Sequence, residues 1–312
     1  MNKIEYPHQS VMLKEALYYL AVQGGGIYID GTYGRGGHTQ SILDHLDKNG
    51  RLVAIDKDVE ACEHAQSHYA NDARFSIQHT SFNHLSDVAT AQGISGSVNG
   101  ILLDLGISSP HVDNPERGFS FMREGPLDMR MDQSTGKTAA QWLAEVSEDD
   151  LERILRVYGE ERYAQRIAKG IIDARQTGAI DSTKRLASII ASLTPSHERH
   201  KHPATRCFQA IRIFINNELE ELQTTLEQAL DVLTVGGRLV VISFHSLEDR
   251  IVKKFINKHA RGDSLPRGLP LIEERICRRL EKINGTVRAS EQEISTNPRA
   301  RSAVLRAVEK IS

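Results

Sequence analysis

Residues 27–39 read IYIDGTYGRGGHT, which is a short apolar run, a glycine-rich turn and the beginning of a mixed polar and apolar segment. Four of the seven residues from Gly31 to Gly37 are glycine. A turn needs residues without a Cβ where the chain bends tightly or where a ligand approaches the main chain. An ordinary glycine-rich connection is the alternative. Because this turn joins a strand-like run to a helix-like one, we expect a ligand site here.

Outward from this turn, short apolar runs alternate with helix-like segments. Apolar runs recur at residues 51–56, 75–77 and 100–104, and helical spacing follows the first of them over residues 58–70. Near-continuous apolar strands separated by helices are typical of a parallel sheet that is covered on both faces. The sequence therefore predicts an α/β fold with helices on both faces of the sheet.

The alternation stops after residue 104, and the next buried strand is predicted only at residues 237–243. The interval 140–193 is helical in pattern, and residues 147–150 read SEDD, which has the form of a capping box at the start of a helix. These features predict a small helical domain inserted between the fourth and fifth strands.

Two further elements return the chain to the sheet. Residues 204–233 contain neither Gly nor Pro and keep apolar residues at helical spacing, so a single long helix is predicted there. Residues 302–308 have the pattern of a late strand. We predict that residues 1–112 and 204–312 form the sheet domain and that residues 113–203 form an inserted, mainly helical substrate-recognition domain.

The glycine turn does not match a dinucleotide site. Counted from Gly34 and Gly36, the G-x-G-x-x-G pattern requires a glycine where this chain has Thr39. The second strand nevertheless ends in Asp56, some twenty residues downstream, where a carboxylate can accept hydrogen bonds from ribose hydroxyls. A nicotinamide-dependent oxidoreductase is therefore disfavoured. A ligand with a nucleoside and without a pyrophosphate group is expected instead.

Three predicted strands end in a carboxylate, at Asp30, Asp56 and Asp104. The carboxyl ends of parallel strands line one crevice, so we expect these side chains to converge. Each one alone is more often a turn former or a helix cap. S-adenosylmethionine suits this site because it carries adenine, a ribose and a sulfonium cation but no phosphate. We therefore expect S-adenosylmethionine as the cofactor.

The composition favours a reducing compartment. The 312 residues include three widely spaced cysteines, which indicate neither a disulfide framework nor a thiolate zinc site. No apolar run approaches the roughly 20 residues that span a bilayer, and the start of the chain has no basic segment leading into an apolar one. We expect a cytoplasmic protein that is not inserted in a membrane.

The net charge of −2 conceals a split along the chain. Residues 250–310 contain 15 Lys or Arg against 7 Asp or Glu, an excess of +8, while residues 1–249 carry −10. A basic segment on an otherwise acidic chain is a plausible footprint for a polyanion such as RNA. A solvated basic surface without a partner is an equally good reading.

The fourth strand runs into residues 104–113, which read DLGISSPHVD. An enzyme that methylates an exocyclic amine must position it in line with the methyl group and hold its protons. Hydroxyls and backbone carbonyls of a rigid turn can do so, and Ser-Ser-Pro is similar to the N/D/S-P-P turn of amino-methyltransferases. Taken alone it is a common turn. We expect Asp104, Ser109 and Pro110 to be the catalytic residues.

Taken together, these segments give the chain a resemblance to the RsmH family, also called MraW. Members of this family methylate the 4-amino group of a cytosine in small-subunit ribosomal RNA. The matching segments cover nearly the whole chain in order, and such a series is far more specific than one glycine turn. They are residues 30–39, 104–110, 116–121 (ERGFSF), 125–132 (GPLDMRMD), 158–161 (YGEE), 201–206 (KHPATR), 242–250 (ISFHSLEDR) and 297–302 (NPRARS).

The resemblance implies a Rossmann-like class I methyltransferase fold with an inserted helical domain. Phe82 becomes a candidate cofactor contact only through the resemblance, and a core aromatic is the alternative reading. His111 stands where the family usually has Gln, so its contact with the cofactor would depend on protonation. The expected cofactor-binding residues are Gly34, Gly36, Gly37, His38, Asp56, Phe82, Asp104 and His111.

Imidazole and positive charge gather before the helix predicted at residue 204. Residues 197–202 read HERHKH, and the polar residues that follow share one helix face. This face either guides RNA or pairs with acids of the inserted domain. His197 and His200 lie three residues apart, so the H-E-x-x-H zinc pattern is not met and no metal is expected. The expected RNA contacts are Lys201, His202, Arg206 and Arg212.

We therefore predict an S-adenosylmethionine-dependent methyltransferase that acts on the N4 amine of a specific cytidine in 16S ribosomal RNA. The transfer is expected to be a direct in-line displacement. The expected partner is 16S ribosomal RNA in the small subunit. The sequence leaves the oligomeric state open, with a homodimer as one candidate. The alternative from another class is a non-catalytic RNA-binding ribosome-assembly factor that retains a nucleoside pocket.

Overall fold

The computed structural model divides into two compact units, which are residues 1–106 with 219–312 and residues 107–218. The boundaries predicted from the sequence differ from this division, because residues 107–112 and 204–218 belong to the second unit. The structure describes residues 10–194, 202–261, 278–283 and 285–312.

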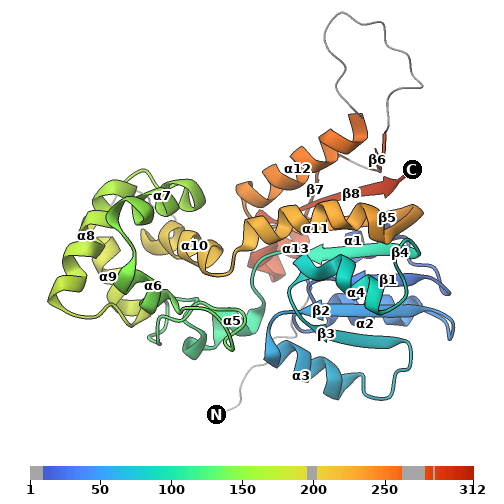
Figure 1. Ribbon diagram of the computed structural model, residues 1–312, viewed down its shortest axis with the longest axis horizontal. Helices are drawn as coiled ribbons and strands as arrows, with labels where there is room; N and C mark the ends of the chain where they lie inside the picture. The colour runs from blue at the N-terminus through green and yellow to red at the C-terminus, as the bar shows by residue number, and fades with distance from the viewer. Residues whose placement is uncertain (1–9, 195–201, 262–277, 284) are drawn as a thin grey trace, which may run out of the picture. The chain divides into compact units, whose positions relative to one another are not determined.

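The first unit is built on a sheet with the strand order β3-β2-β1-β4-β5-β8-β6, and β7 pairs with β8 (Figure 1). Strands β1 to β5 are parallel to their neighbours, whereas β8 is antiparallel to β5, β6 and β7. The predicted α/β fold is therefore confirmed, with an antiparallel edge added. The strands are β1 (Ile27–Asp30), β2 (Arg51–Asp56), β3 (Phe75–His79), β4 (Val98–Asp104), β5 (Leu233–Ser243), β6 (Leu280–Lys282), β7 (Val287–Arg288) and β8 (Val304–Lys310).

The strand order reverses between β1 and β4, which lie side by side in the middle of the sheet. In open α/β sheets, ligands bind outside the carboxyl ends of the strands at such a switch point. Asp30 is the last residue of β1, and Asp104 is the last residue of β4. The topology therefore places both carboxylates at the position where a ligand is expected.

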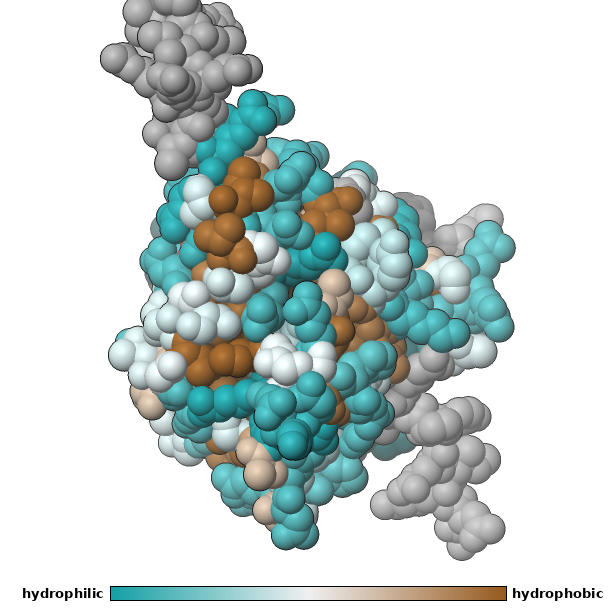
Figure 2. All heavy atoms as spheres, turned by 90° about the vertical axis from the view of Figure 1, so that its right-hand side faces the viewer, coloured by the Kyte–Doolittle hydropathy of each residue, from teal (hydrophilic) through white to brown (hydrophobic). Residues whose placement is uncertain are grey.

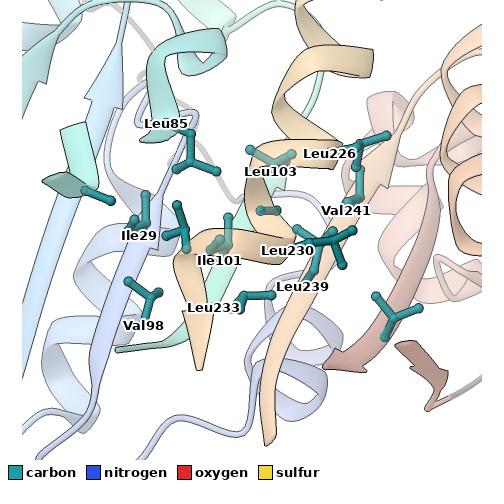
Figure 3. Close-up of a cluster of buried hydrophobic side chains, with 14 of the residues drawn as sticks. Ile29, Leu85, Val98, Ile101, Leu103, Leu226, Leu230, Leu233, Leu239 and Val241 are labelled. Carbon is teal, nitrogen blue, oxygen red and sulfur yellow. The ribbon is translucent and has the colours of Figure 1, made fainter. Parts of the chain in front are cut away.

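Side chains alternate between the two faces of the sheet, as the pleat of a strand requires. Ile29, Ile101 and Leu103 face α4 (Leu85–Ala91), α11 (Glu218–Val232) and α12 (Ser246–Arg261), and they form the core shown in Figure 3. Tyr28 and Leu102 face the opposite side and pack with α1 (Leu13–Leu20) and α2 (Gly37–His45). Helix α3 (Val59–His68) packs against β2 and β3.

The second unit has its own hydrophobic core, formed by residues of its helices and by Phe119, Leu127, Met129 and Met131. The predicted cap at Ser147 is confirmed, because its Oγ accepts a hydrogen bond from the Asp150 N–H at 3.1 Å. No helix among the described residues is long and apolar enough to cross a membrane. The helices of this unit are α5 (Ser109–Asp113), α6 (Ala139–Glu145), α7 (Glu148–Gly159), α8 (Ala164–Thr177), α9 (Thr183–Leu193) and α10 (Ala204–Ile215).

The single helix predicted over residues 204–233 is wrong, because α10 ends at Ile215 and α11 begins at Glu218. Asn217 has a left-handed backbone with φ 53°, a conformation that Asn adopts more readily than most residues. The Asn216 side chain accepts a hydrogen bond from the Met131 N–H and donates one to the Met129 carbonyl, both at 2.7 Å. Hydrogen bonds to a distant loop, together with the left-handed backbone of Asn217, therefore end the helix without Gly or Pro.

Candidate cofactor site

The glycine turn between β1 and α2 is held to both neighbouring strands. The backbone N–H groups of Gly31, Tyr33 and Gly34 donate to Leu102 O (2.9 Å), Ile55 O (3.1 Å) and Asp56 Oδ2 (2.7 Å). These bonds join the turn to β4 on one side and to the end of β2 on the other. The turn is thus a fixed surface at the switch point of the sheet.

Glycine is required in this turn for two different reasons. Gly34 and Gly36 have φ values of 57° and 75°, which disfavour residues with a Cβ. A Cβ on Gly36 would also lie 2.7 Å from the hydroxyl oxygen of Tyr33. That hydroxyl is 2.7 Å from Nδ1 of His64 on α3, which holds the Tyr33 ring in place. Position 36 therefore excludes a side chain both by its backbone and by its surroundings.

Asp30 shapes the turn with both of its carboxylate oxygens. The side chain is only 1% exposed, and it accepts hydrogen bonds from the Thr32 N–H at 3.1 Å and from the Thr39 hydroxyl at 2.7 Å. Burial raises the pKa of Asp30, while nearby His38 and these two hydrogen bonds act in the opposite direction. Asp30 therefore ties the end of β1 to the first turn of α2.

Asp104 and His38 form the most polar part of the site. The Asp104 N–H donates to Thr32 Oγ1 at 2.7 Å, which fixes the end of β4 against the turn. Oδ2 of Asp104 lies 3.5 Å from Nε2 of His38, a charge contact at the outer limit of a hydrogen bond. Among the described residues, no hydrogen bond reaches the buried Oδ1 of Asp104 or either ring nitrogen of His38. Polar atoms of this kind are free to bond a ligand or a water molecule.

Three carboxylates act on the imidazole of His38 through their charge, and this side chain is 5% exposed. Burial lowers the pKa of His38, but Asp104, Asp30 and Glu293 together raise it above its ordinary value. Glu293 lies on α13 (Glu291–Thr296), and its Oε1 accepts a hydrogen bond from the Met12 N–H at 2.7 Å. Sequence reasoning missed Glu293, because it lies far along the chain in a polar segment without a strong pattern.

Asp56 and Phe82 border the same turn. Asp56 accepts hydrogen bonds from the Gly34 N–H at 2.7 Å and from the Asp58 N–H at 2.9 Å, so its carboxylate is fixed in orientation. Phe82 follows β3 in a short 3-10 helix (Phe82–His84) and packs against the core, with its Cβ 3.6 Å from where a Cβ of Gly31 would lie. The structure therefore places Phe82 beside the glycine turn.

Seven of the predicted cofactor-binding residues lie at this one site in the first unit. The fit to S-adenosylmethionine rests on three features: the open main chain of the turn, the fixed carboxylate at the end of β2, and Oδ1 of Asp104 at the end of β4, which no described residue bonds. These features suit a ligand that has a nucleoside and a charged sulfur but no phosphate. The seven residues are Gly34, Gly36, Gly37, His38, Asp56, Phe82 and Asp104.

His111, Ser109 and Pro110 belong to the second unit, in the first turn of α5. Nδ1 of His111 lies 3.3 Å from the Ser108 N and 3.1 Å from the Ser108 Oγ, and its ring is 4.9 Å from that of Phe119. The buried imidazole thus caps the N-terminus of its own helix. A contact between His111 and the cofactor stays a prediction.

The residues predicted to bind RNA have different surroundings. Arg212 makes two hydrogen bonds of 2.8 Å to the carboxylate of Glu218, an acid that lies in the second unit but outside the predicted insertion of residues 113–203. His202 stacks on Phe121 with ring centroids 4.5 Å apart, and its Nδ1 accepts a hydrogen bond from the Ala204 N–H. Arg206 is half-buried on α10, and Lys201 lies outside the described residues.

Comparison with known proteins gives close matches over nearly the whole chain. A model of the MraW methylase family matches residues 5–311. The Ribosomal RNA small subunit methyltransferase H of Shewanella frigidimarina is 51% identical over 309 residues, which are 98% of this chain and 98% of that protein. The proteins of the same name from Thioalkalivibrio sulfidiphilus and Pseudoalteromonas atlantica are 53% and 52% identical over 306 residues, and cover 98% and 97% of this chain and 98% of each relative.

Proposed function

Because the chain belongs to the MraW methylase family and is an S-adenosylmethionine-dependent methyltransferase, we propose that it methylates the 4-amino group of a cytidine in 16S ribosomal RNA. The reaction takes place in the cytoplasm, on the small ribosomal subunit. The observation that carries this proposal is the match over nearly the full length to relatives named for methylation of small-subunit ribosomal RNA.

The cofactor would be held by the residues of the glycine turn and by the ends of β2 and β4. S-adenosylmethionine, when bound, supplies a methyl group on a positively charged sulfur. Asp56 would accept hydrogen bonds from the ribose, and Phe82 would lie along the adenine. Asp104 would accept a hydrogen bond from the cofactor through its buried Oδ1, to which no described residue donates. The bonds that fix Asp104 and the turn in advance reduce the entropy that binding costs.

The acceptor amine would be held by the turn at Ser109 and Pro110. The lone pair of an exocyclic amine is delocalised into the base, so its protons must be held and its nitrogen aligned for the transfer. The Ser109 hydroxyl and the backbone carbonyls of the turn would accept these hydrogen bonds, and Pro110 makes the turn rigid. The rate gain then comes from positioning and from electrostatic stabilisation rather than from a covalent enzyme intermediate.

The proposal is tested by asking which RNA accepts the methyl group. Purified protein is incubated with methyl-labelled S-adenosylmethionine and with small or large ribosomal subunits from cells that lack the corresponding enzyme. Label is expected in the RNA of the small subunit only. Label in the large subunit, or cofactor binding without labelled RNA, would contradict the proposal. The second result would favour the assembly factor without catalysis.

A further inference from the structure

One face of α12 carries positive charge from Arg250 to Arg261. The helix buries Val252, Phe255 and Ile256 against the sheet, so its opposite face is exposed to solvent. The exposed positions follow helical spacing, and none of them is acidic. We call this face the α12 basic stripe. It consists of Arg250, Lys253, Lys254, Lys258 and Arg261.

Ion pairs neutralise only part of the charge in this region. Lys258 bonds Glu227 at 2.7 Å, and next to the stripe Arg306 bonds Asp249 at 2.7 Å. Among the described residues, no ion pair involves Lys253 or Lys254, which lie in the middle of the helix. The attraction between cations and the C-terminal end of a helix accounts for charge in the last turn, but not for these two lysines.

The stripe begins beside the edge of the sheet where the cofactor site lies. Helix α12 starts at Ser246, three residues after β5 ends at Ser243. Ile242 in β5 is the register partner of Asp104 in β4, so the first turn of α12 follows the carboxyl end of the neighbouring strand. From Arg250 to Arg261 the stripe runs away from that edge for about 16 Å, at 1.5 Å for each residue.

The α12 basic stripe is defined by its charge and not by an apolar patch. Figure 2 shows that hydrophobic residues on the right-hand side of Figure 1 form several separate areas, with hydrophilic residues between them. Cations spaced in a row suit a phosphate backbone, because each contact with a phosphate releases bound counterions from the polyanion. Such contacts give affinity and orientation without reading the base sequence.

We propose that the α12 basic stripe is a docking surface for the phosphate backbone of the RNA substrate. It positions the RNA relative to the cofactor edge of the first unit, while other residues select the base. This inference rests on the proposed function, because it takes the substrate to be RNA. Lys253 and Lys254 carry the central part of the surface.

The test compares two double variants of the full-length protein. In Lys253→Gln/Lys254→Gln the stripe loses two charges, and in the control Lys14→Gln/Lys48→Gln the same charge is removed from exposed lysines at α1 and after α2, on the other face of the sheet. Binding to purified small ribosomal subunits is measured between 50 and 200 mM salt. Affinity for S-adenosylmethionine and helical circular dichroism report whether each variant is folded.

Each phosphate contact contributes about 0.7 to 0.9 to the slope of log affinity against log salt concentration. The stripe variant lacks two contacts, so its slope is expected to be smaller in magnitude by about 1.4 to 1.8. At 0.1 M salt this corresponds to binding that is at least about 25-fold weaker, with no change in cofactor affinity. The variant Lys253→Arg/Lys254→Arg is expected to restore the slope. An unchanged slope in the stripe variant, or an equal decrease of the slope in the control, would overturn the docking proposal but not the proposed function. Failure of the wild-type protein to bind subunits would overturn the proposed function as well.

Discussion

Replacing Asp104 by Asn removes one negative charge from the cofactor site and keeps the shape of the side chain. The Asp104 N–H keeps its bond to Thr32, so the end of β4 is expected to stay in place. A hydrogen bond to a charged acceptor contributes about 1.5–3 kcal/mol, against about 0.5–1.5 kcal/mol for a neutral one. The loss of about 1 to 1.5 kcal/mol predicts that S-adenosylmethionine binds the variant roughly 5- to 13-fold more weakly.

The same substitution is expected to change how stability depends on pH. The folded-state pKa of His38 is raised, and Asp104 is the first of the three carboxylates that raise it. Because its pKa is raised by folding, His38 contributes to the free energy of unfolding fully below its unfolded pKa of about 6.5. This contribution is lost as the pH rises through the pKa of His38 in the folded protein. The difference in unfolding free energy between wild type and Asp104→Asn should therefore be largest below about pH 6.5 and shrink above it.

Calorimetric titration with S-adenosylmethionine and urea unfolding at several pH values measure these two effects. The matched control is Asp72→Asn, because Asp72 pairs with Arg74 at 2.6 Å and neither residue belongs to the cofactor site. Its cofactor affinity should equal that of the wild type. Equal affinity of Asp104→Asn and wild type, or a stability difference that is constant with pH, would refute the role given to Asp104.

Three further substitutions test other parts of the structure. Arg117→Met should lower the unfolding free energy by about 1–3 kcal/mol, measured by urea unfolding, because the buried guanidinium donates to backbone carbonyls that would lose their partner. Gly36→Ala should weaken cofactor binding, because a left-handed Ala costs about 1–2 kcal/mol and its Cβ would contact Tyr33; unaltered affinity in a titration would argue against this. Glu293→Gln should lower the pKa of His38, observed by NMR titration of the imidazole, and an unshifted titration curve would contradict the electrostatic contact.

Local sequence pattern was sufficient to predict the centre of the sheet. Strands β1, β2 and β4 are nearly continuous apolar runs, and each ends in the Asp that the sequence analysis singled out. The glycine turn was predictable for the same reason, because clustered residues without a Cβ have few other uses between a strand and a helix. The positions of Asp30, Asp56 and Asp104 at one edge then follow from the parallel arrangement of the strands.

The elements that were missed depend on contacts between distant parts of the chain. β6 and β7 are short and polar, and they form by pairing with β8 rather than by their own pattern. The break at Asn216 depends on hydrogen bonds to a loop some 85 residues earlier in the sequence. Glu293 is positioned by a hydrogen bond from the Met12 N–H, which lies 281 residues away along the chain. Such long-range bonds leave no periodic signal in the sequence.

The roles of the three acidic residues at the strand ends were also beyond local pattern. Asp30, Asp56 and Asp104 look equivalent in the sequence, yet their hydrogen bonds differ. Both carboxylate oxygens of Asp30 accept hydrogen bonds from the turn and the helix that follows it. Oδ1 of Asp104, in contrast, is buried and has no hydrogen-bond partner among the described residues. Only the arrangement of Thr32 and Thr39 around Asp30 separates a structural carboxylate from one that is available to a ligand.

The most direct test of the account is to identify the atom that receives the methyl group. Small-subunit RNA labelled by the wild-type protein is digested to nucleosides, and the labelled nucleoside is identified by mass spectrometry against synthetic standards. We predict N4-methylcytidine with the wild-type protein and a marked decrease with Asp104→Asn. Label on a ring carbon, on a ribose hydroxyl or on another base would contradict the claim that this fold and site carry out amine methylation of cytidine.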